Sequence, residues 1–176
     1  MNDCFKCDLS IKRNNIVYGK GNKDSNIFII GEAPGYYEDK HGVPFIGKSG
    51  NLLRRYLGYV DIDETNAYFT NVVKCRPPNN RIPSTVEVST CVKYFLSKEI
   101  EVIKPKIIVT VGATSTNLIF GSIEPITKRI NKVFTLGNKQ VLPIYHPSYI
   151  LQNGLEYKYM EYIVLLSKNI DKLMFK

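Results

Sequence analysis

The chain has 176 residues, of which 44% are hydrophobic, and this length supports one well-packed domain over residues 1–176 rather than two. Its 24 basic against 16 acidic residues give a net charge of +8, which favours a polyanionic partner such as nucleic acid, although a basic surface can also serve solubility alone. No apolar run is long enough to cross a bilayer and the first residues lack the apolar middle of a signal peptide, so we expect a soluble intracellular protein with no membrane partner.

The first predicted strand leads into a long loop. Residues 26–30, NIFII, follow a polar lead-in, and their β-branched and aromatic content predicts a buried parallel strand. Residues 31–50 then read GEAPGYYEDKHGVPFIGKSG and are rich in glycine, proline and charge. Since open α/β sheets place their ligands in long loops at the carboxyl ends of strands, we predict that this loop is the floor of an active site.

Helices and strands alternate through the rest of the chain. An amphipathic pattern predicts a helix over 49–59, and residues 67–74 predict a second strand that enters a breaker-rich loop at 75–83. Ser84, followed three residues later by Glu87, has the capping-box pattern of a helix start, and this helix should end near residue 103. The remaining predicted elements are a strand at 106–111, a short helix at 112–120, a strand at 141–145 and a closing helix at 155–173.

This alternation predicts the α/β class, as a three-layer α/β/α fold with a central, mainly parallel four-stranded sheet. Pro143 in the last strand indicates an edge position or irregular pairing. The loops that begin at Gly31, Asn71 and His146 each follow a strand, so they should open at the same edge of the sheet.

One motif in the first loop is misleading. Residues 42–49, GVPFIGKS, match the phosphate-binding pattern G-x-x-x-x-G-K-S. A working P-loop follows directly on a strand, whereas about eleven residues separate this one from its strand, and Pro44 lacks the N–H that a phosphate cradle needs. We therefore do not expect a nucleoside triphosphatase.

The chain has four cysteines, namely Cys4, Cys7, Cys75 and Cys91. They can be read as four reduced thiols, as a redox-active CxxC, or as one four-thiolate site; structural disulfides are not expected without a secretion signal. Zinc and an iron–sulfur cluster both accept four thiolates, and the wide, uneven spacing favours the cluster slightly over zinc. Either metal would tie the N-terminal segment to the second loop.

Three side chains could form a pocket for a pyrimidine base. Asn71 can accept from N3–H and donate to O4 of uracil, a pair that cytosine presents in reverse. Phe45 could stack on the base, and His146 could donate to a carbonyl oxygen that gains charge as a glycosidic bond breaks. Each also has an ordinary structural interpretation, because Asn71 could cap a turn, Phe45 could belong to the core and His146 could be a satisfied structural histidine.

Taken together, three stretches are far more specific. GEAPGYYEDKHGVPFIGKSG, TNVVKCRPPNNRIP and HPSYIL, with four cysteines around them, closely resemble the iron–sulfur uracil-DNA glycosylases, which form family 4 of their superfamily. The resemblance runs from Cys4 to about Leu151 in the family's order. It implies a three-layer α/β/α fold, a [4Fe–4S] cluster, and a hydrolase that excises uracil from DNA without cutting the strand.

The resemblance also implies site residues. The DNA-probing loop of the family falls on residues 146–151, and Glu38 would exclude the methyl group of thymine. The implied cluster ligands are Cys4, Cys7, Cys75 and Cys91. The implied uracil-pocket residues are Gly31, Glu32, Ala33, Glu38, Phe45, Asn71 and His146.

The chain departs from the family pattern in two places and lacks two features that related enzymes use. Gln152 stands where the family often has arginine, and Arg129 is followed by Ile130 rather than by glycine. The segment GEAPG has no aspartate or asparagine to direct water, and the loop around 122–133 has no histidine that could trap the product covalently. These departures concern DNA contacts and efficiency, and we do not expect covalent capture.

The expected mechanism is hydrolysis of the N-glycosidic bond of a flipped-out deoxyuridine by a monomer acting on uracil-containing DNA. His146 would stabilise the uracil anion, Asn71 would read the base, and Glu32 would stabilise the sugar cation or orient water. The predicted phosphate contacts are Lys48, Arg54, Lys74, Arg76 and Arg81. The predicted probing-loop contacts are Ser148, Tyr149, Ile150 and Leu151, the last three as an apolar wedge.

Two other classes of function remain open at this point. A non-catalytic DNA-binding module with the same fold, serving replication, is compatible with Gln152 and with the missing Arg-Gly pair. An electron carrier is compatible with a cluster, but it leaves Asn71, Phe45 and His146 without a role. Product formation and the redox behaviour of the cluster would distinguish the three.

Overall fold

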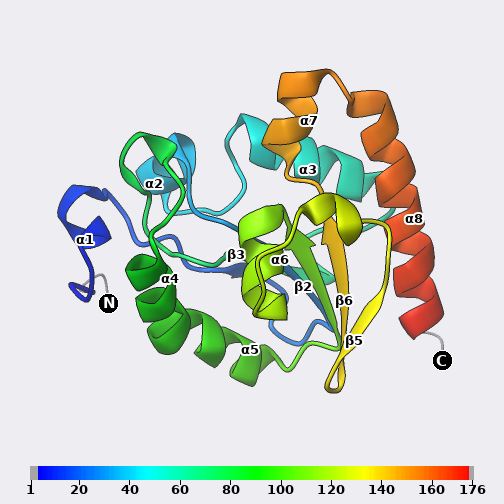
Figure 1. Cartoon of the computed structure of the whole chain (residues 1–176), viewed down its shortest axis with the longest axis horizontal. Helices are drawn as coiled ribbons and strands as arrows, with labels where there is room; N and C mark the ends of the chain where they lie inside the picture. The colour runs from blue at the N-terminus through cyan, green and yellow to red at the C-terminus, as the bar shows by residue number, and fades with distance from the viewer. Residues whose placement is uncertain (1–3, 175–176) are drawn as a thin grey trace.

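The computed structural model describes residues 4–174, which form one six-stranded sheet flanked by helices (Figure 1). The four predicted strands are present and mutually parallel. The prediction of four strands was nevertheless wrong, because two short antiparallel strands extend the edges, and segments of two and three residues are too short for a detectable alternation. In sheet order the strands are β1 (Lys20–Gly21), β3 (Ala67–Asn71), β2 (Ile27–Gly31), β4 (Ile107–Val111), β6 (Lys139–Ile144) and β5 (Phe134–Leu136).

The register of the parallel strands brings the loop starts together. β2 pairs with β3 so that Gly31 lies opposite Asn71 at the carboxyl ends of both strands. On the other side of the sheet, β5 pairs only with residues 139–141 of β6. Pro143 therefore lies past the end of β5, where its missing N–H costs no ladder bond to that strand, in agreement with the local edge position that proline predicts.

Helices cover both faces of the sheet, which confirms the three-layer architecture. The α-helices are α1 (Leu9–Lys12), α2 (Tyr36–His41), α3 (Lys48–Gly58), α4 (Thr85–Cys91), α5 (Ser97–Ile103), α6 (Ala113–Phe120), α7 (Pro147–Asn153) and α8 (Glu156–Met174), with 3-10 turns at Pro78–Asn80 and Ile126–Lys128 and a π-helical segment at Val92–Leu96.

Alternating strand residues divide the core into two apolar layers. Ile29 and Val109 face the layer shared with α3, α7 and α8, whereas Phe28 and Ile108 face the layer shared with α5 and α6. Because every residue of β2 is buried, the strand has no polar face, as expected for a central parallel strand. In Figure 1, α8 runs along one side of the sheet, and α6 lies in front of it.

The long helix predicted after the second loop is confirmed, with a π-helical segment between α4 and α5. Its capping box is also present, since the Glu87 N–H donates to Ser84 Oγ at 3.3 Å and the Ser84 N–H donates to Glu87 Oε2 at 2.7 Å. The short helices α2 and α7 lie inside segments predicted as loops. Among residues 4–174, no helix combines the length and the hydrophobicity needed to cross a membrane.

Candidate active site

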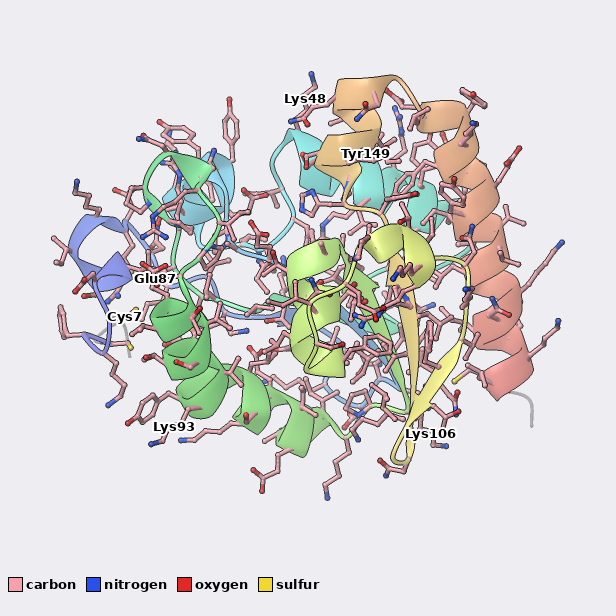
Figure 2. The ribbon with its side chains drawn as sticks, in the orientation of Figure 1. Cys7, Lys48, Glu87, Lys93, Lys106 and Tyr149 are labelled. Atoms are coloured by element: carbon pink, nitrogen blue, oxygen red, sulfur yellow. The ribbon has the colours of Figure 1, made fainter. Side chains whose placement is uncertain are left out.

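A pocket of about 490 Å³ opens at the carboxyl ends of the parallel strands. The three loops that begin at Gly31, Asn71 and His146 all contribute to its wall, so the predicted convergence is confirmed. Figure 2 shows Lys48 and Tyr149 at this end of the molecule, and Lys106, just before β4, at the opposite end. The lining residues predicted from the sequence are Glu32, Ala33, Glu38, Phe45, Lys48, Asn71, Arg81, His146 and Ser148.

Asn71, Phe45 and Gly31 meet at the floor of the pocket. A Cβ atom added to Gly31 would lie 2.5 Å from Asn71 Oδ1 and 2.8 Å from Phe45 Cζ. Both side chains therefore pack directly over the glycine, at a distance that leaves no room for any larger residue. The close approach explains why a glycine stands at the end of β2.

The Asn71 amide is available to a ligand. The residue is only 3% exposed, yet among the described residues its side-chain oxygen and nitrogen have no hydrogen-bond partner. No fully buried side-chain polar atom in that part of the chain lacks a partner. The unpaired Asn71 amide is therefore not fully buried, and it opens into the pocket that Asn71 lines. A buried amide that is left unpaired is costly, so this one is well suited to bind a polar edge.

A buried ion pair holds the backbone at Asn71. Lys74 is fully buried, and its Nζ donates to the Asn71 carbonyl at 2.7 Å, to Thr70 Oγ1 at 2.5 Å and to Glu99 Oε2 at 2.6 Å. Burial lowers the pKa of Lys74, while Glu99 opposes that shift. Lys74 therefore stabilises the end of β3 and does not face solvent, so the predicted phosphate contact by this lysine is wrong in this structure.

Phe45 is held in an unusual backbone conformation. Its φ is +57°, and Gly50 packs so closely that a Cβ atom there would lie 2.3 Å from the Phe45 carbonyl carbon. Arg54 Nε donates to the Phe45 carbonyl at 2.9 Å, and Arg54 also pairs with Glu64 at 2.7 Å. Arg54 thus fixes the loop that carries Phe45, and the prediction that it binds a phosphate is not supported by these contacts.

Glu38 organises the first loop from within. Its Oε1 accepts from the N–H groups of Ile46 at 2.9 Å and Gly47 at 2.7 Å, and its Oε2 accepts from the Gly35 N–H at 3.1 Å. The side chain still lines the pocket. Three N–H donors to one carboxylate join the start of α2 to the start of α3, so Glu38 acts first as a positioning residue.

Glu32 is oriented by a residue that the sequence analysis missed. Thr114 Oγ1, in the first turn of α6, donates to Glu32 Oε2. Glu32 follows β2 and lines the pocket, so the hydroxyl aims the carboxylate at the site. The sequence did hold a signal for this residue, because Thr114 follows β4 at the same edge of the sheet as the three predicted loops.

His146 is held as a neutral imidazole. The Ser148 N–H donates to Nδ1 at 3.2 Å, so Nδ1 is an acceptor and the ring proton is on Nε2. Ser148 Oγ lies 2.6 Å from the same nitrogen. Burial lowers the pKa of His146 to about 4. Gly112, with a φ of +91°, packs against the side chain, where a Cβ atom would lie 2.9 Å from His146 Cβ.

The predicted DNA contacts separate into two groups. Lys48, Arg81 and Ser148 line the pocket, and Arg76 lies beside it with its Nε donating to Asn80 Oδ1 at 2.7 Å. Arg81 is also bidentate with Glu87, at 2.8 and 2.6 Å, and this pair lowers the pKa of the Glu87 carboxyl to about 2.

The probing loop is a helix rather than an open loop. Tyr149 is 44% exposed and stacks on Tyr145 with ring centroids 5.0 Å apart, but Ile150 is fully buried and packs in the core. In this structure Ile150 cannot serve as a wedge, so that part of the prediction is wrong. Leu151 is half-buried and Gln152 lines the pocket.

The four cysteines gather on one side of the sheet. Cys75 and Cys91 are buried in the layer with α5, and Cys4 and Cys7 pack against the same apolar cluster. The Lys74 N–H donates to Cys91 Sγ at 3.2 Å, and Arg13 Nη1 lies 3.6 Å from Cys75 Sγ and 2.7 Å from the Cys4 carbonyl. Burial raises the pKa of the Cys7 and Cys75 thiols. It also raises the pKa of the Cys91 thiol, to about 12.

These observations partly fit a four-thiolate site. Four free thiols from distant parts of the sequence pack in or against one group of apolar core residues. N–H donors point at two of their sulfurs, as second-shell donors do around bound metals. In the described range 4–174, however, no three histidine, cysteine, aspartate or glutamate side chains are arranged closely enough to hold a metal ion. The donor set therefore has the right chemistry, while the structure shows no ligand geometry.

The chain is similar to known proteins over most of its length. The description "Uracil DNA glycosylase superfamily" belongs to the family model that matches residues 18–166. A Type-4 uracil-DNA glycosylase of Thermotoga maritima is 46% identical over 152 residues, which are 85% of this chain and 79% of that protein. Another, of Archaeoglobus fulgidus, is 40% identical over 156 residues, which are 84% and 78% of the two chains. A DNA polymerase of Bacillus phage SP01 is 33% identical over 147 residues, which are 83% of this chain and 15% of the polymerase. The chain therefore belongs to the uracil-DNA glycosylase superfamily and, within it, to the family of the type-4 enzymes.

Proposed function

We propose that this chain is a monofunctional uracil-DNA glycosylase, which hydrolyses the N-glycosidic bond of a flipped-out deoxyuridine in DNA and so begins base excision repair. The observation that supports it most directly is the unpaired amide of Asn71 beside the ring of Phe45, in one pocket with His146. One chain contributes all of these groups, so we further propose that it acts as a monomer.

The floor of the pocket accounts for the choice of base. Asn71 Oδ1 would accept from N3–H of uracil and Nδ2 would donate to O4, while the ring of Phe45 packs on the base. Cytosine offers an acceptor at N3 and a donor at N4, so it would face Asn71 with both groups mismatched. Because a buried polar edge left unpaired is strongly disfavoured, a fixed amide discriminates well.

His146 and Glu32 account for the chemistry. As the bond to the sugar lengthens, negative charge grows on the base and positive charge on the sugar. The neutral His146 would donate from Nε2–H to the developing oxyanion. Glu32, aimed by Thr114, would stabilise the sugar cation or orient the attacking water. Glu38 is held by three backbone N–H groups, and from that position it would also exclude the methyl group of thymine.

The cysteines support the proposal of a [4Fe–4S] cluster held by Cys4, Cys7, Cys75 and Cys91, with zinc as the alternative. The support is their common location and the resemblance to the iron–sulfur family. A cluster there would supply a rigid covalent link between the N-terminal segment and the loop after β3. The chemistry of excision would remain with the pocket residues.

One of the comparisons favours a second candidate function. The phage DNA polymerase contains a segment similar to most of this chain, which favours a replication-associated DNA-binding module as the alternative. The two functions differ in their product: the enzyme releases free uracil, whereas the module binds uracil-containing DNA and releases none.

The direct test is excision from a uracil-containing oligonucleotide by the purified chain, followed by alkali cleavage of the abasic site. Asn71→Ala should lower the single-turnover rate on the order of a hundredfold or more, because N3–H and O4 then have no partner. Asn138→Ala, in the exposed turn between β5 and β6, is the matched control and should behave as the parent. An Asn71→Ala variant that excises uracil at the parent rate would remove the base-reading role.

A further inference from the structure

Two tyrosines at the mouth of the pocket have no role in the chemistry above. Tyr36 and Tyr37 are the first two residues of α2, they are 52% and 56% exposed, and both line the pocket. Their rings are nearly perpendicular, at 85°, with centroids 5.4 Å apart. Large aromatic side chains this exposed, adjacent to a binding pocket, indicate a contact surface.

The helix that carries the tyrosines is firmly held beneath them. Asp39 is buried and accepts from the N–H groups of Asn14 at 2.9 Å and Asn15 at 3.2 Å. Glu38, next to it, accepts the three backbone N–H groups described above. The two rings are therefore presented on a rigid base, so a ligand that stacks on them would lose little conformational entropy in ordering the helix.

Arginine and lysine side chains lie near the pair. The Arg76 guanidinium lies 5.2 Å from the centroid of the Tyr36 ring, and Lys48 and Arg81 line the same pocket. Aromatic faces next to cations are the combination that binds single-stranded nucleic acid, since bases stack on the rings and phosphates meet the charges. An acidic or purely apolar partner would match only one of these two features.

We propose that Tyr36 and Tyr37 form a stacking subsite for an unpaired nucleobase that neighbours the flipped deoxyuridine. The inference rests on the proposed function, because the pocket must hold the uracil while the neighbouring base reaches the tyrosines. Every base has a π-face, so the subsite holds the strand without selecting its sequence. It favours single-stranded or locally opened DNA over intact duplex, in which the neighbouring base is stacked on its own strand.

The test measures binding without turnover. Single-stranded oligonucleotides contain 2′-fluoro-deoxyuridine, which resists hydrolysis, flanked by normal bases or with the 5′ or the 3′ neighbour replaced by an abasic spacer. For the parent chain, one of the two spacers should weaken binding about tenfold. A Tyr36→Ala, Tyr37→Ala double variant should bind the normal oligonucleotide about tenfold more weakly and should no longer respond to that spacer.

Matched variants separate stacking from other effects. Tyr36→Phe with Tyr37→Phe keeps the rings and should bind as the parent does. Tyr157→Ala, at a tyrosine on α8 that is 66% exposed, should also be neutral. With 2-aminopurine as the neighbouring base, its fluorescence should be quenched by the parent and by the phenylalanine variant but not by the alanine variant.

Three results would overturn the subsite. They are parent-like DNA binding by the alanine variant, a spacer effect that persists in that variant, and tyrosine-dependent self-association of the chain without any change in DNA binding. Failure of the proposed function gives a different pattern, in which the spacer effect depends on the tyrosines but no uracil is released from ordinary substrate.

Discussion

At the scale of single residues, His146 shows how the fold selects one protonation state. The backbone N–H of Ser148 occupies Nδ1, and burial moves the pKa down to about 4 from an ordinary value of 6.5. An imidazolium would have to give up the bond to Nδ1 and lose solvation, whereas the neutral ring keeps both the bond and a free Nε2–H for the substrate. The donor that the proposed mechanism needs is thus present at neutral pH.

The same shift predicts a pH-dependent stability. Between about pH 6.5 and 4 the unfolded chain binds a proton at His146 that the folded chain excludes, so stability falls as the pH falls through that window and this contribution is constant below it. Its full size is roughly 3 kcal/mol, since the pKa falls from 6.5 to about 4 and one pKa unit is about 1.4 kcal/mol. Urea unfolding at pH 7, 5.5 and 4.5 should show a smaller loss for His146→Gln than for the parent.

His41 supplies the control for that measurement. It is the other histidine of the chain, at the end of α2, and it is exposed. His41→Gln should therefore keep the parent's loss of stability at low pH. Equal pH dependence in the parent and in His146→Gln would show that His146 is not the group that titrates.

At the scale of elements, the first loop is built around one carboxylate. Glu38 joins the start of α2 to the N–H groups just before α3 through three hydrogen bonds. The same segment carries Phe45 and presents Tyr36 to the pocket. A single carboxylate therefore ties the backbone next to Phe45 to the start of the helix that carries Tyr36.

Glu38→Gln tests this organising role. Glutamine has one acceptor oxygen, and its NH₂ group would face an N–H that the carboxylate now receives. The expected cost is about 1–3 kcal/mol of unfolding free energy, the range for a lost hydrogen bond to a charged group. The KM for uracil-containing DNA should rise more than kcat falls, because the loop loosens while His146 and Glu32 stay in place.

Urea unfolding and steady-state excision measure the two effects. Glu101→Gln, on the exposed side of α5, removes a comparable charge away from the pocket and should change neither. If Glu38→Gln kept both the stability and the KM of the parent, the three hydrogen bonds would not be what holds the loop.

At the scale of the whole molecule, the long apolar strands and the loops that follow them could be predicted from the sequence. The residues that each side chain contacts in the fold could not. The four central strands and the convergence of Asn71, Phe45 and His146 followed from alternation and from sheet topology. The two edge strands are too short for any periodic pattern.

The wrong or missed residues share a physical cause. Lys74 resembled a phosphate ligand because its partly buried partner, Glu99, comes 25 residues later on another element. Ile150 resembled a wedge because the segment was taken for a loop, whereas the first turn of α7 directs it into the core. In both cases a distant contact decides where the side chain lies, and the sequence does not reveal that contact.

The four cysteines come from parts of the chain that are far apart in the sequence, and replacing one of them provides the last prediction. Cys4 and Cys7 precede the first strand, while Cys75 begins the loop that carries Arg76 and Arg81 to the mouth of the pocket. If the four thiols hold a cluster, its loss frees the N-terminal segment and loosens that loop at the same time. The effect should therefore appear in stability and in DNA affinity rather than in the chemical step.

Cys91→Ser is the variant of choice, because Cys91 lies in α4 and its Sγ accepts from the Lys74 N–H. The parent should be brown and contain about four irons per chain, whereas the variant should be colourless and melt several degrees lower. It should also be cleaved by protease before residue 20, and its KM should rise while its single-turnover rate at saturating DNA changes little. Ser89→Ala, exposed on the same helix, should match the parent in every respect.

A colourless parent with one bound zinc would assign the site to zinc. A parent with no metal, and a Cys91→Ser variant as stable as the parent, would show that the four thiols are ordinary core residues.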